Sequence, residues 1–152
     1  MIRLASAEDI CSIVELRIKL IKEVNGNIED SDLNKLSKAL NRYLYDGLSN
    51  GNVVVFLAEE DGKIVAISVM CFYNIIPLPS NIDGKMALLS DMYTLPEYRN
   101  KGLGMNLLIK IMDYAKKLGY KKVILNATES GRRLYLKYGF KDVTGEMSYK
   151  FI

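Results

Sequence analysis

The sequence predicts a mixed α/β fold, with a central sheet that is mostly antiparallel and carries helices on both faces. Its length of 152 residues is typical of one compact domain, which we expect to span residues 1–152. Hydrophobic residues make up 49% of the chain, which is enough for a core. The middle of the chain has the order strand, glycine loop, helix, strand, helix, which favours one parallel strand pair, and hairpin patterns flank it on both sides.

The first half of the chain contains two predicted helices and three predicted strands. Apolar residues recur at helical spacing over residues 10–21 and 31–48. Ser6 and Asp9 form a capping-box pattern before the first helix, with Asp in place of Glu. The polar residues 25–32 are expected to form the loop between the two helices. Strands are predicted over residues 2–4, 52–59 and 63–72, the last two joined by an Asp-Gly turn.

The second half begins with a loop that contains Pro77, Pro79 and Gly84. A strand is predicted over residues 86–95, and a helix over residues 104–118, after which Gly119 would close the helix. The remaining predicted elements are a strand over 122–126, a helix over 130–138, and a terminal hairpin of residues 140–144 and 146–151 that turns at Gly145.

Composition excludes several classes of function. The chain has no histidine, so catalytic triads and histidine metal sites are ruled out, and we expect no metal. The 21 basic and 18 acidic residues are too balanced to indicate nucleic-acid binding. No apolar run approaches the roughly 20 residues of a membrane span, and Glu8 and Asp9 interrupt the start of any signal peptide. Cys11 and Cys71 lie in apolar segments, which predicts buried thiols in a reducing cytoplasm.

The most informative segment, residues 96–105, links a predicted strand to a predicted helix. Gly102 and Gly104 leave room for a ligand, and Arg99 and Lys101 add positive charge near the backbone N–H groups of the helix start. These features are typical of a phosphate-binding loop. The spacing matches neither a P-loop nor the dinucleotide fingerprint. A tight strand-to-helix turn without a ligand is the alternative interpretation.

Two motifs resemble those of the GNAT-type N-acetyltransferases. Arg99-x-x-Gly102-x-Gly104 resembles the family's pyrophosphate-binding motif R/Q-x-x-G-x-G/A. Asn126 and Leu134-Tyr135-x-x-x-Gly139-Phe140 resemble its second signature, at a matching separation. The resemblance covers about residues 52–151, whereas the first two helices agree in number and placement only. It implies the GNAT fold, in which two parallel strands of a mixed sheet splay apart.

The resemblance also implies acetyl-CoA as co-substrate, bound in the gap between the splayed strands. Backbone groups of Met92, Tyr93 and Thr94 would contact the pantetheine arm. Asn126 would bind a pantetheine amide, or it is only a turn residue. The pyrophosphate would be held by Arg99, Asn100, Lys101, Gly102, Leu103, Gly104 and Met105. The glycines, the two cations and the helix start of this loop support the last assignment independently of the resemblance.

Tyr135 matches the family residue that protonates the leaving CoA thiolate. A phenol with a pKa of about 10 can protonate a thiolate whose acid has a pKa of about 8.5. Without the resemblance, Tyr135 would be interpreted as a core aromatic residue. Tyr138 lies three residues later on the same predicted helix and is expected to pack in the core.

The general base is less evident than the acid. Family members often carry Glu or His at positions that match Leu88 or Ser90, and neither residue titrates here. Asp91 is the nearest carboxylate, but regular strand alternation would turn it to the opposite face unless a β-bulge rotates it. Otherwise a water chain held by Ser90 would accept the proton.

Two further features bear on the acceptor and the mechanism. Glu29 and Asp30 lie in the acidic loop where family members shape the acceptor pocket, and they would suit a cationic amine such as a polyamine or aminoglycoside. Solvated loop charge explains them equally well. Cys71 would permit an acetyl-cysteine intermediate, but its sequence neighbours offer no cation to activate the thiol.

The sequence therefore predicts an acetyl-CoA-dependent N-acetyltransferase that acts on a primary amine of a small molecule or peptide by direct attack. The alternative is a non-catalytic CoA-binding or regulatory module of the same fold, because no base occupies Leu88 or Ser90. No nucleic-acid or membrane partner is expected. The resemblance allows a homodimer, since members of this family are often dimers, and the sequence leaves the oligomeric state open.

Overall fold

Five strands form one mixed sheet in the order β1-β2-β3-β4-β5. The computed structural model describes residues Met1–Ile152. Strands β1 to β4 pair with one another in antiparallel order, and β5 pairs with β4 in parallel. The predicted fold class is thereby confirmed. The strands are β1 (Ile2–Leu4), β2 (Val53–Glu60), β3 (Lys63–Asn74), β4 (Lys85–Thr94) and β5 (Val123–Ile124).

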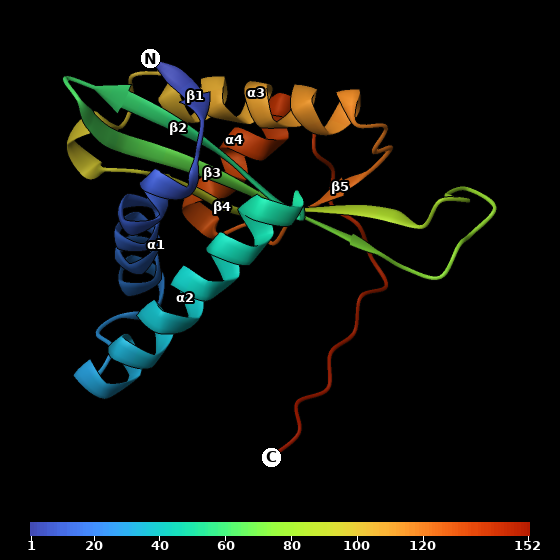
Figure 1. The fold of residues 1–152 in the computed structure, drawn as a ribbon. Helices are drawn as coiled ribbons and strands as arrows, with labels where there is room; N and C mark the ends of the chain where they lie inside the picture. Colours follow the sequence, from blue (N-terminus) through green and yellow to red (C-terminus); the bar gives the residue numbers. More distant parts are fainter.

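Helices cover both faces of this sheet (Figure 1). The two N-terminal helices lie on one face, and the helix that follows the glycine loop lies on the other. None of the helices combines the length and hydrophobicity needed to cross a membrane. The helices are α1 (Ile10–Asn25), α2 (Asp30–Asn50), α3 (Leu103–Lys117) and α4 (Glu129–Tyr138), with short 3-10 turns η1 (Ala7–Asp9) and η2 (Pro96–Tyr98).

All four predicted helices are confirmed, and the loop between α1 and α2 is shorter than predicted. It spans residues 26–29, because α2 already begins at Asp30. Asp30 and Asp32 occupy the first turn of α2, where negative charge is favourable next to the helix N-terminus.

The core fills the space between the sheet and the helices on each side. On the first face, a Cβ added to Gly47 of α2 would lie 2.3 Å from a methyl carbon of Val53 in β2, so these two elements are in close contact. On the second face, Phe56 of β2 packs edge-on against Tyr114 of α3, with ring centroids 5.8 Å apart. The largest fully buried apolar side chains are Ile13, Leu57, Ile67, Met70, Leu107, Leu108 and Ile111.

Strand β4 contains a β-bulge at Ser90. Val69 of β3 pairs with Asp91, and the next residue, Met70, pairs with Leu89, so Ser90 is an additional residue in β4. The extra residue breaks the regular alternation of side chains. As a result, Asp91 shares the face of Leu88, the face that α1 and α2 cover.

Strand β5 is very short and pairs with only part of β4. The paired residues are Ala87 with Val123 and Leu88 with Ile124. From Leu89 to Thr94, β4 continues with β3 on one side and no strand on the other. This open edge has the position expected for the splayed strand pair.

The predicted C-terminal hairpin is wrong. Residues 141–152 form neither helix nor strand and extend away from the rest of the protein (Figure 1). The sequence alternates as a strand would, but β5 offers an edge of only two residues for pairing. The segment is anchored to α4 by an ion pair between Arg132 and Asp142.

An ion-pair network holds the N-terminal residues against β2. Arg3 of β1 donates two hydrogen bonds of 2.8 Å to the carboxylate of Asp9 and one of 3.2 Å to Glu59. Asp9 also accepts a hydrogen bond of 2.8 Å from the backbone N–H of Ser6, as the predicted capping box requires. The hydrogen bonds from Arg3 lower the pKa of the buried Asp9 carboxyl from 3.8 to about 2.

The variant Asp9→Asn is expected to lower the free energy of unfolding by about 2 kcal/mol at pH 7, which is the free energy equivalent to the lowered pKa. A carboxyl whose pKa is lower in the folded state stabilises the fold above its unfolded pKa. This contribution is lost as the pH falls from 3.8 to about 2. Urea unfolding at pH 7 and at about pH 2 measures the difference between the variant and the wild type, which should shrink at the lower pH.

The control is Asp32→Asn, which removes an exposed carboxylate 4.0 Å from Lys35. An exposed pair of this kind contributes at most about 1 kcal/mol. Equal losses in the two variants, or a loss in Asp9→Asn that does not depend on pH, would contradict the assignment.

Candidate active site

The glycine loop, residues 96–105, connects the end of β4 to the start of α3. Asn100 has a φ of +62° and Gly102 a φ of +81°, so the chain turns sharply before the helix begins. None of the backbone N–H groups from Asn100 to Met105 donates a hydrogen bond within the chain. Unpaired N–H groups at a helix N-terminus form a site for a phosphate or another anion.

Arg99 holds this loop against α1. Its guanidinium donates two hydrogen bonds, of 2.8 and 2.7 Å, to the carboxylate of Glu23, and its Nε donates one of 2.9 Å to the carbonyl of Thr94. These bonds from Arg99 lower the pKa of Glu23. The charge of Arg99 is therefore already paired, and the loop's other cation, Lys101, lies 4.9 Å from the ring centroid of Tyr98.

The open edge of β4 lies next to this loop. It includes the backbone of Met92, Tyr93 and Thr94, the three residues predicted to contact the pantetheine arm. Asn126 is exposed and follows the end of β5 by two residues, beyond the last paired residues Leu88 and Ile124. The strand gap, Asn126 and the glycine loop thus lie along one side of the sheet.

Tyr135 occupies the middle of α4 and is partly buried. Its ring packs edge-on against Phe140 at a centroid distance of 5.8 Å. A Cβ on Gly131 would lie only 3.2 Å from this ring, so the absence of a side chain there makes room for it. Burial, together with the negative charge of Asp91, raises the pKa of Tyr135 to about 12. Its phenol is therefore protonated at neutral pH, and the negative charge of Asp91 contributes to this by disfavouring the phenolate.

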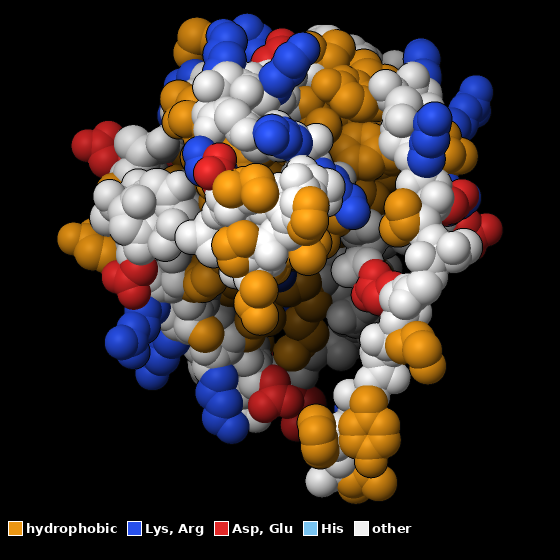
Figure 2. All heavy atoms as spheres, turned by 90° about the vertical axis from the view of Figure 1, so that its right-hand side faces the viewer, with side chains coloured by type: hydrophobic (Ala, Val, Ile, Leu, Met, Phe, Trp, Pro, Cys, Tyr) orange, Lys and Arg blue, Asp and Glu red, His pale blue; other side chains and the backbone are white.

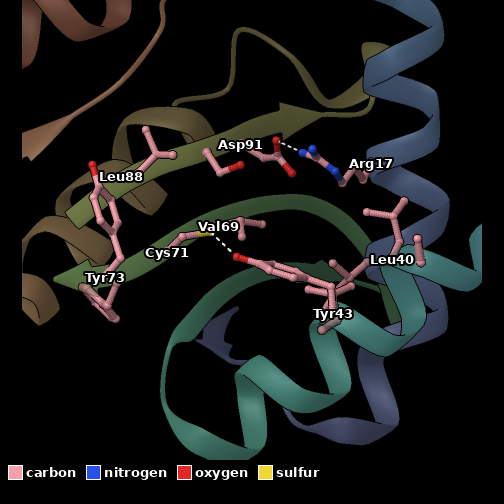
Figure 3. A pocket seen from close by; sticks show the side chains of 13 residues that line it. Arg17, Leu40, Tyr43, Val69, Cys71, Tyr73, Leu88 and Asp91 are labelled. Atoms are coloured by element: carbon pink, nitrogen blue, oxygen red, sulfur yellow. Dashed lines mark hydrogen bonds and ion pairs between the residues drawn. The ribbon is translucent and has the colours of Figure 1, made fainter. Parts of the chain in front are cut away.

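A cavity of about 540 Å³ opens between the sheet and the two N-terminal helices (Figure 3). Ten of its 13 lining residues are hydrophobic. Side chains of α1 and α2 form one wall, and side chains of β3 and β4 form the other. The lining residues are Ile13, Arg17, Ala39, Leu40, Tyr43, Leu44, Val69, Cys71, Phe72, Tyr73, Leu88, Ser90 and Asp91.

Asp91 and Arg17 form the only ion pair of this cavity. Arg17 of α1 donates to Oδ1 of Asp91, as the dashed line in Figure 3 shows. Asp91 is 5% exposed, and its second oxygen, Oδ2, has no hydrogen-bond partner. A buried carboxylate oxygen without a partner is costly in a folded protein, which marks it as a site for a ligand donor.

A second polar contact links the two walls of the cavity. The hydroxyl of Tyr43 in α2 donates to the Sγ of Cys71 in β3 at 3.4 Å. Burial is the main cause that raises the pKa of the Cys71 thiol, and the charge of Asp91 adds to it. Cys71 is therefore a poor nucleophile at neutral pH. Cys11, predicted to be buried, is exposed instead, because it lies on the solvent side of α1.

The predicted acceptor residues are distributed unevenly around this cavity. Ser90 and Asp91 line it, whereas Glu29 and Asp30 are exposed and do not. Asp30 precedes Tyr43 by 13 residues of α2, which corresponds to about 20 Å along the helix axis. Arg17 and Tyr43 also line the cavity, and the sequence did not identify them as site residues. Each lies on an amphipathic helix, and only the packing of α1 and α2 on the sheet brings them to the cavity.

Comparison with known proteins places this fold and site in one family. The model of the acetyltransferase (GNAT) family matches residues 23–140. An uncharacterized N-acetyltransferase of Bacillus subtilis, YhfO, is 31% identical over 111 residues, 70% of this chain and 71% of that protein. The glucosamine 6-phosphate N-acetyltransferase of Arabidopsis thaliana is 27% identical over 130 residues, 84% of this chain and 81% of that protein.

A solved structure agrees with these relatives. The crystal structure of a protein described as a predicted acetyltransferase, from Clostridium acetobutylicum with acetyl-CoA, superposes with a TM-score of 0.89. It is 30% identical, and the match covers 99% of this chain and 95% of that one. The fold and these relatives define an acyltransferase. The chain belongs to the GNAT family of acetyltransferases.

The reactivity of the two cysteines tests the environment of Cys71. At pH 7, iodoacetamide is expected to modify the exposed Cys11 much faster than Cys71, since the thiolate is the reactive form and burial disfavours it. Modification of Cys71 should accelerate as the pH rises. Peptide mass spectrometry follows both sites in one sample, with Cys11 as the internal control. Equal rates at pH 7 would show an activated Cys71 and would favour the acetyl-cysteine intermediate.

Proposed function

We propose that this protein transfers the acetyl group of acetyl-CoA to a primary amine of a small molecule or peptide by direct attack. The observation that carries this proposal is Asp91, which lines a cavity beside the open edge of β4 and whose buried Oδ2 has no hydrogen-bond partner. A carboxylate in this position can accept a proton from an incoming ammonium ion. The two free cysteines fit a reducing cytoplasm as the place of this reaction.

Acetyl-CoA is assigned to the glycine loop and the strand gap. The unpaired N–H groups of Asn100 to Met105 would bind the pyrophosphate, and the backbone of Met92, Tyr93 and Thr94 would bind the pantetheine arm. Asn126 would add a side-chain amide. The presence of acetyl-CoA in the similar structure from Clostridium acetobutylicum supports this assignment. Arg99, already paired with Glu23, would hold the loop in shape rather than neutralise phosphate.

The transfer forms a C–N bond and breaks the C–S bond of the thioester. Asp91, directly or through a water at Ser90, accepts one proton from the ammonium ion, and the neutral amine then attacks the thioester carbonyl. The backbone N–H of Met92 would stabilise the negative charge that develops on the carbonyl oxygen. As the intermediate collapses, Tyr135 gives its proton to the CoA sulfur, and the proton lost by the amide nitrogen replaces it.

The high pKa of Tyr135 is compatible with this role. A phenol with a pKa of about 12 is fully protonated at neutral pH and so can donate a hydrogen bond to the leaving sulfur. Burial raises the pKa of the Tyr135 phenol, and it would also raise the pKa of the CoA thiol placed beside it. The two pKa values would therefore stay close enough for proton transfer.

The placement of Asp91 weakens the alternative of a non-catalytic CoA-binding module. That alternative rested on the lack of a titratable residue at Leu88 and Ser90. The bulge brings a carboxylate to the same face of the strand as Leu88, so the chain has a candidate base after all.

The variant Tyr135→Phe is expected to lower kcat by a factor of about 100 or more, because it removes the proton donor, while the affinity for acetyl-CoA stays within about twofold. Release of the CoA thiol, followed with a colorimetric thiol reagent, gives kcat, and calorimetry gives the affinity. Tyr138→Phe is the matched control on the same helix and should retain nearly full turnover. Undiminished turnover of Tyr135→Phe would remove this residue from the mechanism.

We also propose a homodimer that buries two protruding apolar segments. One is the C-terminal segment, residues 141–152, which Figure 2 shows descending to the bottom of the view with hydrophobic side chains exposed. The other is the tip between β3 and β4, residues 75–82. Contiguous exposed apolar runs typically mark an interface. Their exposed apolar residues are Ile75, Ile76, Leu78, Ile82, Val143, Met147, Tyr149, Phe151 and Ile152.

A second copy is the partner that best fits these segments. The C-terminal segment places Met147, Tyr149 and Phe151 at alternate positions, as a strand would, and it pairs with no strand of its own chain. Exchange of such a segment between identical chains is a common route to dimers.

Light scattering after size exclusion is expected to give twice the mass of the 17.2 kDa chain. The double variant Tyr149→Asp, Phe151→Asp should give a monomer, since it places charge in the apolar interface without touching the core. Lys150→Asp, which changes charge in the same segment at a polar position, is the control and should remain dimeric. A wild-type monomer, or a dimer unaffected by the double variant, would contradict the proposal.

A further inference from the structure

The cavity between the sheet and the N-terminal helices contains very little charge to match a polar substrate. Its walls are apolar on both sides, with Ile13, Leu40 and Leu44 from the helices facing Val69 and Leu88 from the sheet (Figure 3). Its only charged side chains are Arg17 and Asp91, which form one ion pair and together add no net charge.

Arg17 is not available to bind an anionic group of the acceptor. Its guanidinium is paired with Asp91, whose buried carboxylate would lose its partner if Arg17 turned to a phosphate or carboxylate of a substrate. Breaking such a buried pair is strongly unfavourable. An acceptor with a phosphate group would therefore enter this cavity without a counter-charge.

A polycationic acceptor is equally poorly matched. The acidic residues Glu29 and Asp30 lie at the distant start of α2 and do not line the cavity. Asp91 is the only carboxylate in the lining, and it can bind one ammonium group through its unpaired Oδ2. Further ammonium groups would have to be buried against Leu and Val side chains, which is costly.

We propose that the acceptor is a monoamine with an apolar carbon skeleton, whose ammonium group binds Oδ2 of Asp91 and whose skeleton fills the cavity against Tyr43. This inference rests on the proposed acetyl transfer and specifies its acceptor. The volume of about 540 Å³ is within the range of small-molecule sites and accommodates an arylalkyl or alkyl chain. Tyr43 is then the residue that determines specificity, because its ring forms part of the wall and its hydrogen bond to Cys71 fixes its orientation.

The test compares amines by their kcat/KM, measured as CoA release. From n-propylamine to n-hexylamine, kcat/KM is expected to rise by about fourfold for each methylene, the factor that corresponds to burial of one CH₂ group. 2-Phenylethylamine should exceed spermidine, kanamycin and glucosamine 6-phosphate by at least tenfold. A flat alkylamine series, or a preference for any of the three polar amines, would overturn the apolar acceptor while leaving acetyl transfer intact.

The variant Tyr43→Glu tests the specificity role directly. It places a carboxylate in the wall of the cavity, so the ratio of kcat/KM for n-hexylamine to that for 1,6-diaminohexane should fall by at least tenfold. Tyr45→Glu is the matched control, because Tyr45 lies on the same helix and is exposed to a similar degree (61% against 53% for Tyr43) but does not line the cavity, and it should leave the ratio unchanged. Equal ratios in the two variants would contradict the assignment of Tyr43.

Failure of the proposed function gives a different result from failure of this inference. If acetyl-CoA binds by calorimetry but no amine of any class releases CoA, acetyl transfer itself is wrong, and the acceptor assignment is overturned with it. If the polar amines react and the apolar ones do not, only the acceptor class is wrong.

Discussion

Ser90 has no partner in β3, and this single extra residue determines which side chains of β4 face the cavity. Because of it, Asp91 lies on the same face as Leu88, within reach of Arg17 of α1 and on the side of the sheet that α1 and α2 cover. In a regular strand the carboxylate would point to the opposite face, against α3. In a chain without histidine, the proposed base depends on this bulge, and the proposed acid is the partly buried Tyr135, whose raised pKa keeps its phenol protonated.

Helix α1 contacts both the cavity and the glycine loop. Arg17 pairs with Asp91 in the cavity, and two turns later Glu23 pairs with Arg99 of the glycine loop. The same helix therefore contacts both the carboxylate that we propose as the base and the loop that we propose binds the pyrophosphate.

Features that depend on short local patterns were predictable from the sequence. The glycine loop, the helix that carries Tyr135 and the Asp-Gly hairpin all agree with the structure, since their signals lie within about ten residues. Features that depend on packing were not. Nothing local marks Arg17 or Tyr43. The side of the sheet that Asp91 faces depends on a bulge that the family resemblance allows for, because a bulge in this strand recurs in the family, but that no pattern of residues in this strand specifies. The C-terminal residues show strand alternation, but alternation does not say whether a partner edge exists.

We propose that the bulge and the glycine loop together hold the thioester between Asp91 and Tyr135. A crystal structure with acetyl-CoA tests this most directly. We expect pyrophosphate oxygens within about 3 Å of backbone nitrogens in residues 100–105, the sulfur within hydrogen-bond distance of the Tyr135 hydroxyl, and Asp91 facing the acetyl carbon across the cavity. A pyrophosphate bound elsewhere, or a thioester remote from both Asp91 and Tyr135, would contradict it.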